Sequence, residues 1–69
     1  MKKIKIKVNG KIRSISEIYK LSDLINHLKI PIKKVAIELN EEIIDKKKVK
    51  KIKLRQNDKI EIVHFIGGG

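Results

Sequence analysis

The sequence contains no cysteine among its 69 residues. This excludes a disulfide, a thiolate metal site and a cysteine nucleophile within the chain. Tryptophan is also absent, and Tyr19 and Phe65 are the only aromatic residues, so few side chains could stack on nucleic acid bases. One proline and four glycines leave little material for linkers. A chain of this length and composition predicts one small domain.

Acidic residues are scarce as well. Eight acidic residues face eighteen basic ones, which gives a formal net charge of +10, and such a charge attracts polyanions. Sixteen of the basic residues are lysine, however, and arginine occurs only as Arg13 and Arg55, although arginine is the residue best suited to bidentate phosphate contacts. We therefore expect no specific nucleic-acid site, and a basic RNA-binding module is the alternative from another functional class.

Long apolar runs are missing too. The opening stretch "MKKIKIKVNG" alternates apolar and charged residues, unlike the continuous apolar region of a signal peptide, and no stretch approaches transmembrane length. The sequence therefore predicts a cytoplasmic protein that does not contact a membrane.

The first alternating segment predicts a β-hairpin. Residues 4–8 alternate isoleucine or valine with lysine, which is the period of a strand with one buried face. Asn9-Gly10 follows and favours a type I′ turn, so a return strand should begin at Lys11. Because Ile12 and Ile15 fall on opposite faces of that strand, we expect a bulge or an early end.

A single amphipathic helix is predicted next. Its apolar residues recur at helical spacing and are Leu21, Leu24, Ile25 and Leu28. Ser22 or a neighbouring residue should cap the helix, and Asp23 is favourable in its first turn. The helix should stop before Pro31 after about three turns.

Alternation returns over residues 35–39, which predicts a third strand, and a turn leads to a short apolar pair, Ile43-Ile44. The lysine-rich run "DKKKVKKIK" then begins at Asp45. Its charges indicate a solvated loop or a single helical turn, held to the domain by Val49 and Ile52.

The last strand lies at the carboxyl end of the sequence. "RQND" at residues 55–58 is a turn signal in which Asn57 tolerates a left-handed conformation. The stretch "KIEIVHFI" follows, with Ile60 and Ile62 on one face and Val63 and Phe65 on the other.

These elements predict an α+β fold. One mixed sheet of four or five strands should carry the single helix across one face, with the first and last strands side by side in the middle. Residues 1–66 would form this domain, and residues 67–69, all glycine, would form a flexible tail.

Two stretches resemble a known family. "VAIELNEEII" at residues 35–44 and "NDKIEIVHFIGGG" at residues 57–69 are similar to the ThiS family, the sulfur carrier proteins of thiamine biosynthesis, which have the ubiquitin-like β-grasp fold. Family members commonly have a proline-arginine pair just after the fourth strand, where this chain has Asp45-Lys46, and they are often near neutral or acidic.

The resemblance implies a substrate rather than an enzyme. In the family, a ThiF-like adenylating enzyme uses ATP to activate the carboxylate that here belongs to Gly69, and sulfur derived from cysteine then converts it to a thiocarboxylate. A ThiG-like thiazole synthase takes that sulfur. Gly67 and Gly68 would enter the partner active site, and the carrier itself would hold no cofactor or metal. Related carriers serve molybdopterin synthesis and tRNA thiolation, and these remain alternatives.

A docking patch is expected on the sheet face opposite the helix. Strand parity places Ala36, Val63 and Phe65 together on that face, next to the tail, where an exposed apolar cluster would suit a partner enzyme. The alternative is that Phe65 simply covers its own sheet. His64 should be a half-buried or rim residue without a metal or catalytic role.

Overall fold

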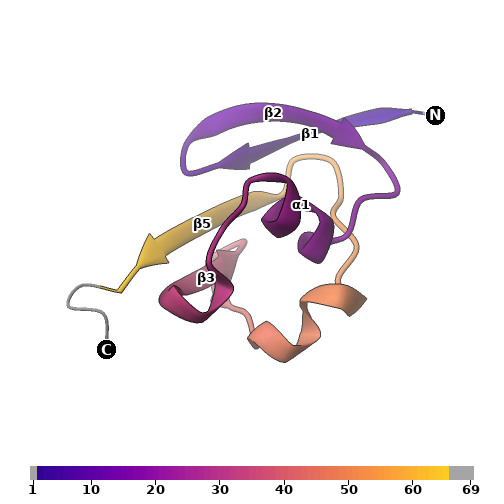
Figure 1. The fold of residues 1–69 in the computed structure, drawn as a ribbon. Helices are drawn as coiled ribbons and strands as arrows, with labels where there is room; N and C mark the ends of the chain where they lie inside the picture. Colours follow the sequence, from indigo (N-terminus) through magenta and orange to yellow (C-terminus); the bar gives the residue numbers. More distant parts are fainter. Residues whose placement is uncertain (1, 66–69) are drawn as a thin grey trace.

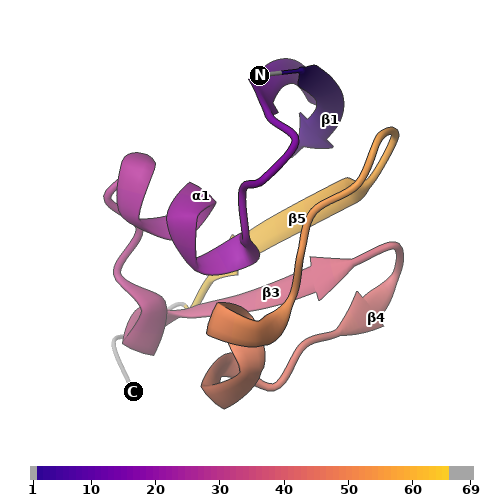
Figure 2. The same cartoon turned by 90° about the vertical axis from the view of Figure 1, so that its right-hand side faces the viewer.

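A computed structural model describes residues 2–65. The described chain forms one five-stranded mixed sheet, an α-helix and two short 3-10 helices (Figures 1 and 2). The elements are β1 (Lys3–Val8), β2 (Lys11–Ser16), α1 (Leu21–His27), η1 (Ile32–Lys34), β3 (Val35–Leu39), β4 (Glu42–Ile43), η2 (Lys46–Lys51) and β5 (Lys59–His64). The expected α+β class, the strand count and the single α-helix are confirmed.

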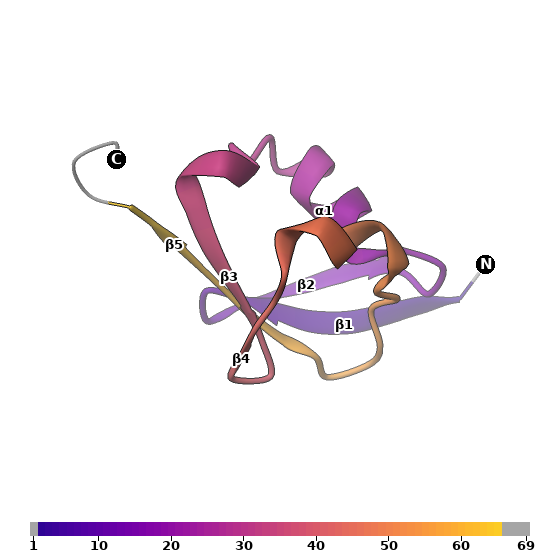
Figure 3. The ribbon, with the colours of Figure 1, turned by 90° about the horizontal axis from the view of Figure 1, so that it is seen from below.

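The sheet has the strand order β2-β1-β5-β3-β4. Strands β1 and β5 are parallel, and all other neighbours are antiparallel. The first and last strands therefore lie side by side at the centre, as predicted. Because β1 and β5 run in the same direction, the start of β1 and the end of β5 lie at opposite ends of the molecule (Figure 3).

The β1–β2 hairpin turns at the predicted dipeptide. Asn9 and Gly10 have φ values of 49° and 82°, the left-handed conformation that a type I′ turn requires at both positions. The expected bulge or early end in β2 was wrong, because β1 and β2 pair without interruption from Val8↔Lys11 to Lys3↔Ser16. Strand parity places the two isoleucines of β2 on opposite faces, so Ile15 is buried and Ile12 is exposed without any bulge.

Helix α1 begins two residues earlier than a Ser22 cap would place it. Its N-cap is Lys20, and the Asp23 carboxylate accepts the Lys20 backbone N–H at 2.8 Å. The aspartate therefore satisfies one of the backbone donors at the start of the helix, which is the second half of a capping box. The expected cap by Ser22 was therefore wrong, and Asp23, which was expected in the first turn, supplies the capping carboxylate.

The end of α1 differs from the prediction. The helix has seven residues, about two turns rather than three. Lys29 takes a φ of 55°, and the Ile30 N–H donates to the Ile25 carbonyl at 3.0 Å, which is the hydrogen bond of a Schellman motif. The left-handed conformation of Lys29 therefore ends the helix, and Pro31 is not needed to stop it.

The lysine-rich run, predicted to be a solvated loop or a single helical turn, forms a 3-10 helix of six residues, about two turns. In η2 the Asp45 side chain caps the turn by accepting the Lys47 N–H at 2.9 Å, and Val49 is buried in the core. Ile52 packs against that core. Asn57 has a φ of 71°, as its place in the following turn predicted.

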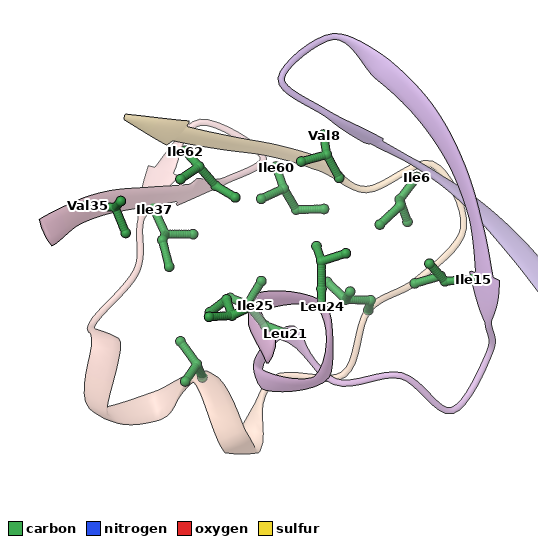
Figure 4. Close-up of a cluster of buried hydrophobic side chains, with 12 residues drawn as sticks. Ile6, Val8, Ile15, Leu21, Leu24, Ile25, Val35, Ile37, Ile60 and Ile62 are labelled. Atoms are coloured by element: carbon green, nitrogen blue, oxygen red, sulfur yellow. The ribbon is translucent and has the colours of Figure 1, made fainter. Parts of the chain in front are cut away.

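The hydrophobic core fills the space between the sheet on one side and α1 and η2 on the other (Figure 4). Its buried members are Ile6, Val8, Ile15, Leu21, Leu24, Ile25, Val35, Ile37, Val49, Leu54, Ile60 and Ile62. Strands β1, β3 and β5 each contribute alternate residues, which confirms the predicted inward parity, and β2 contributes Ile15 alone. No buried polar or charged side chain occurs among residues 2–65, so this core is held by apolar contact alone.

Candidate functional site

The candidate site is the end of β5, which leads the chain to the terminal glycines. Central pairing with β1 and β3 holds the strand, and its last residues extend past the β1–β2 hairpin toward one end of the molecule (Figure 3). Gly67, Gly68 and Gly69, the residues predicted to enter the partner and to carry the activated carboxylate, lie outside the described residues, as does the boundary between domain and tail. The described part of the site is therefore its base.

The three residues predicted to form a docking patch share the sheet face opposite α1. Ala36 pairs directly with Val63 in the β3–β5 ladder, and the Phe65 N–H continues that ladder by donating to the Lys34 carbonyl at 2.9 Å. Val63 is 56% exposed and Phe65 is 51% exposed, while Ala36 is half-buried. We call Ala36, Val63 and Phe65 the docking corner. Two large apolar side chains in solvent beside a chain end are typical of an interaction surface.

His64 lies on the rim of the helix-facing side, opposite the docking corner. It pairs with Val35 at the start of β3 and is exposed. Of the two expectations for His64, an exposed rim position is confirmed and a half-buried side chain is not. It also lines a shallow groove with Arg13 and Ile30. No group of three potential metal ligands occurs among residues 2–65.

Lys46 is the residue that the sequence did not reveal. Its ammonium donates to the Val35 carbonyl at 2.9 Å and lies 5.2 Å from the centre of the Phe65 ring, within the range of a cation–π contact. The other fifteen lysines are exposed, whereas Lys46 is half-buried. The sequence shows it only as the first of a run of similar lysines. Two signals were available: Lys46 directly follows the helix-capping Asp45, and it stands where ThiS family members commonly have the arginine of a proline-arginine pair.

Asn9 has a second role beyond the turn. Its side-chain oxygen accepts the Ile62 N–H at 2.7 Å, and its side-chain amide donates to the Ile62 carbonyl at 3.2 Å. Pairing between β1 and β5 ends at Val8 and Ile60. The Asn9 side-chain amide then makes the two hydrogen bonds to Ile62 that the backbone of a further β1 residue would make, and so extends the pairing of β5 toward the docking corner. An Asn-Gly pair predicts the turn but not this contact, which depends on where β5 lies.

Comparison with known proteins identifies the family. The family model described as "ThiS family" matches residues 6–69. The chain belongs to the ThiS family. A sulfur carrier protein ThiS from Bacillus subtilis is 37% identical over 65 residues, which cover 93% of this chain and 98% of that protein. The resemblance drawn from residues 35–44 and 57–69 is therefore confirmed.

A solved structure shows the same ThiS fold. The crystal structure of the thiamine biosynthesis protein ThiS from Geobacter metallireducens matches with a TM-score of 0.83 and 28% identity, covering 96% of this chain and all of that one. A second kind of relative is much longer. A thiazole synthase from Paramagnetospirillum magneticum is 38% identical over 66 residues, and the chain spans only 20% of its length.

No helix within residues 2–65 is long and apolar enough to span a membrane.

Proposed function

We propose that this ThiS family member is the sulfur carrier of thiamine biosynthesis and that the carboxylate of Gly69 carries the sulfur as a thiocarboxylate. The observation that carries the proposal is the family match over residues 6–69, which includes the whole glycine end. The Bacillus subtilis relative, a sulfur carrier protein by name, is of nearly the same length. The protein is then a substrate of its partners rather than a catalyst, since the reacting group is its own carboxylate.

The chemistry requires a partner that uses ATP. One oxygen of the Gly69 carboxylate attacks the α-phosphorus of ATP, pyrophosphate leaves, and an acyl-adenylate forms. A sulfur nucleophile at the oxidation level of sulfide, derived from cysteine, then attacks the acyl carbon, and AMP leaves with the carbon–oxygen bond electrons. The product is a thiocarboxylate. ATP thus belongs to a ThiF-like adenylating enzyme and is not a cofactor of the carrier.

Glycine suits this step for a steric reason. The carboxylate must reach the α-phosphate inside a nucleotide pocket, and a glycine has no side chain that could collide with the walls of a narrow passage. Gly67 and Gly68 are the residues that would occupy the passage. We propose that the adenylating enzyme binds to the docking corner, whose residues Val63 and Phe65 come shortly before these glycines in sequence.

Thiazole synthase is the proposed acceptor of the sulfur. Thiazole synthases from Paramagnetospirillum magneticum and Magnetococcus marinus each contain a segment similar to this chain, and that segment makes up 20% of their length. A carrier-like segment within a thiazole synthase supports a working relationship between the two activities. It favours thiamine biosynthesis over molybdopterin synthesis or tRNA thiolation as the pathway that this carrier serves.

The intact mass of the protein tests the proposal. The chain is incubated with ATP, a ThiF-like enzyme and a sulfide source, beside a variant that lacks Gly69. We expect a mass gain equal to the replacement of one oxygen by sulfur, located at Gly69 and absent from the variant. No adenylate and no mass change with an enzyme that activates the Bacillus subtilis carrier would refute the function. Steeply salt-dependent RNA binding would then favour the RNA-binding alternative.

A further inference from the structure

The contacts of Lys46 distinguish it from the rest of a lysine-rich surface. A lysine side chain that is held in one geometry loses conformational entropy, and fifteen lysines of this chain are exposed. Lys46 alone is half-buried, with its ammonium close to two specific groups, the Val35 carbonyl and the Phe65 ring.

The hydrogen bond from Lys46 to Val35 replaces a backbone hydrogen bond that a longer β4 would make. Strand β4 pairs with β3 over two residues only, and the last backbone bond between them joins the Ile44 N–H to the Ile37 carbonyl at 2.8 Å. The chain then turns away into η2. Backbone groups alternate along a strand, so the next carbonyl that points to this edge belongs to Val35. Lys46 donates to it at 2.9 Å and so takes the place of the absent β4 residue.

The second contact reaches the docking corner. Phe65 follows the end of β5, and its backbone N–H donates to the carbonyl of Lys34, the residue directly before β3, at 2.9 Å. Its ring is half in solvent, which by itself leaves the ring free to change rotamer. The ammonium that is fixed on Val35 lies 5.2 Å from the ring centre and attracts the electron-rich face of the ring in one orientation.

We propose that Lys46 is a positioning residue for partner docking: it holds the Phe65 ring in the orientation that the adenylating enzyme binds. The proposal rests on the sulfur-carrier function proposed above. A ring that is already in its bound orientation loses less freedom when the complex forms, and affinity rises accordingly. Lys46 itself takes no part in the adenylation chemistry, so it should affect binding of the carrier and leave turnover unchanged.

Three variants isolate this role. Lys46→Met keeps the length of the apolar stem and removes the ammonium, while Lys46→Arg restores a donor and a cation. Lys48→Met is the matched control, since Lys48 belongs to the same turn of η2 and is exposed. The two methionine variants therefore carry the same net charge and differ only in the contacts that they lose.

The first readout needs no partner. In the NMR spectrum of the full chain, the methylene protons beside the Lys46 ammonium should be shifted upfield by the Phe65 ring, and the shift should vanish in Phe65→Leu. Hydrogen exchange at the Phe65 amide, which reports on the end of β5, should quicken in Lys46→Met and remain unchanged in Lys48→Met. Unshifted methylene protons in the native chain would overturn the proposal.

The second readout is the adenylation rate as a function of carrier concentration. We expect Lys46→Met to raise the KM for the carrier about three- to tenfold with kcat within about twofold, Lys46→Arg to recover most of the loss, and Lys48→Met to match the native chain. Equal KM values for the two methionine variants would overturn the positioning role alone. A native chain that is not adenylated would instead overturn the proposed function.

Discussion

The two faces of β5 differ sharply in exposure. Ile60 and Ile62 point toward α1 and are 0% and 8% exposed, whereas Val63 and Phe65, on the other face, are more than half exposed. All four are apolar and belong to one stretch of six residues. Their exposure is therefore set by what covers each face, because only the inner face has a helix packed against it.

This difference separates stability from recognition within a single strand. The inner face joins a core without buried polar groups among the described residues, and its side chains contribute free energy of folding. No helix within residues 2–65 packs against the outer face, so Val63 and Phe65 are the apolar side chains that we propose for contact with another protein. Substitutions on the two faces should consequently produce effects of different kinds.

Ile60→Ala is expected to have the largest effect on folding. The side chain is fully buried in the central strand, and its truncation should lower the free energy of unfolding by about 2 to 5 kcal/mol, a large share of the stability of so small a domain. Urea denaturation measures the loss. Ile43→Ala, at a residue 77% exposed in β4, is the matched control and should change stability by less than about 0.5 kcal/mol.

Phe65→Ala should affect the partner rather than the fold. We expect the KM for the carrier in adenylation to rise about tenfold or more, with the urea midpoint nearly unchanged. Ile18→Ala removes an exposed apolar side chain that lies outside the sheet and should alter neither quantity. The opposite pattern, a destabilised fold with an unchanged KM, would mean that Phe65 simply covers its own sheet.

Asn9→Gly tests the side-chain hydrogen bonds by which Asn9 extends the pairing of β5 toward the docking corner. Glycine accepts the left-handed φ of 49° but lacks the amide that bonds to both backbone groups of Ile62. We expect a loss of about 1 to 2 kcal/mol in unfolding free energy and faster hydrogen exchange at Ile62. Asn9→Ala should lose more, because it adds strain at the turn.

Ile12→Thr should have the smallest effect and defines the extent of the docking corner. Ile12 is 66% exposed on β2, at the opposite edge of the sheet from β4. Threonine preserves the β-branched shape, so we expect stability to change by less than about 0.5 kcal/mol and the KM for the carrier to stay within about twofold. A large increase in KM would extend the docking surface across the whole outer face.

Sequence patterns predicted those parts of the fold in which a residue's conformation or burial is determined by residues close to it in sequence. The alternation in β1, β3 and β5, the turn at Asn9-Gly10 and the left-handed Asn57 are of this kind. The expected bulge in β2 was wrong because it assumed that both isoleucines must be buried. Ile12 lies on an edge strand and remains exposed. The length of α1 was wrong because Lys29, rather than a glycine, takes the left-handed position that closes the helix.

Contacts between distant segments were not predictable. The bonds from Asn9 to Ile62 and from Lys46 to Val35 depend on how the strands lie in space, and neither residue type signals them in sequence. The lysine run conceals Lys46 because its neighbours are chemically alike. The docking corner could be placed from parity alone, since parity requires only that β3 and β5 be adjacent strands.

The sheet order has a consequence for how the protein is made. Strand β5 separates the β1–β2 hairpin from the β3–β4 hairpin, and no direct strand pairing joins those two units. Because synthesis proceeds from the amino terminus, both hairpins leave the ribosome before the strand that unites them. Gly67, Gly68 and Gly69 follow that strand in sequence, so under the proposed function every chain that can be activated at Gly69 already contains the segment that completes its fold. If Gly69 is activated as we propose, fragments from premature termination lack the reacting carboxylate, and a ThiF-like enzyme spends no ATP on them.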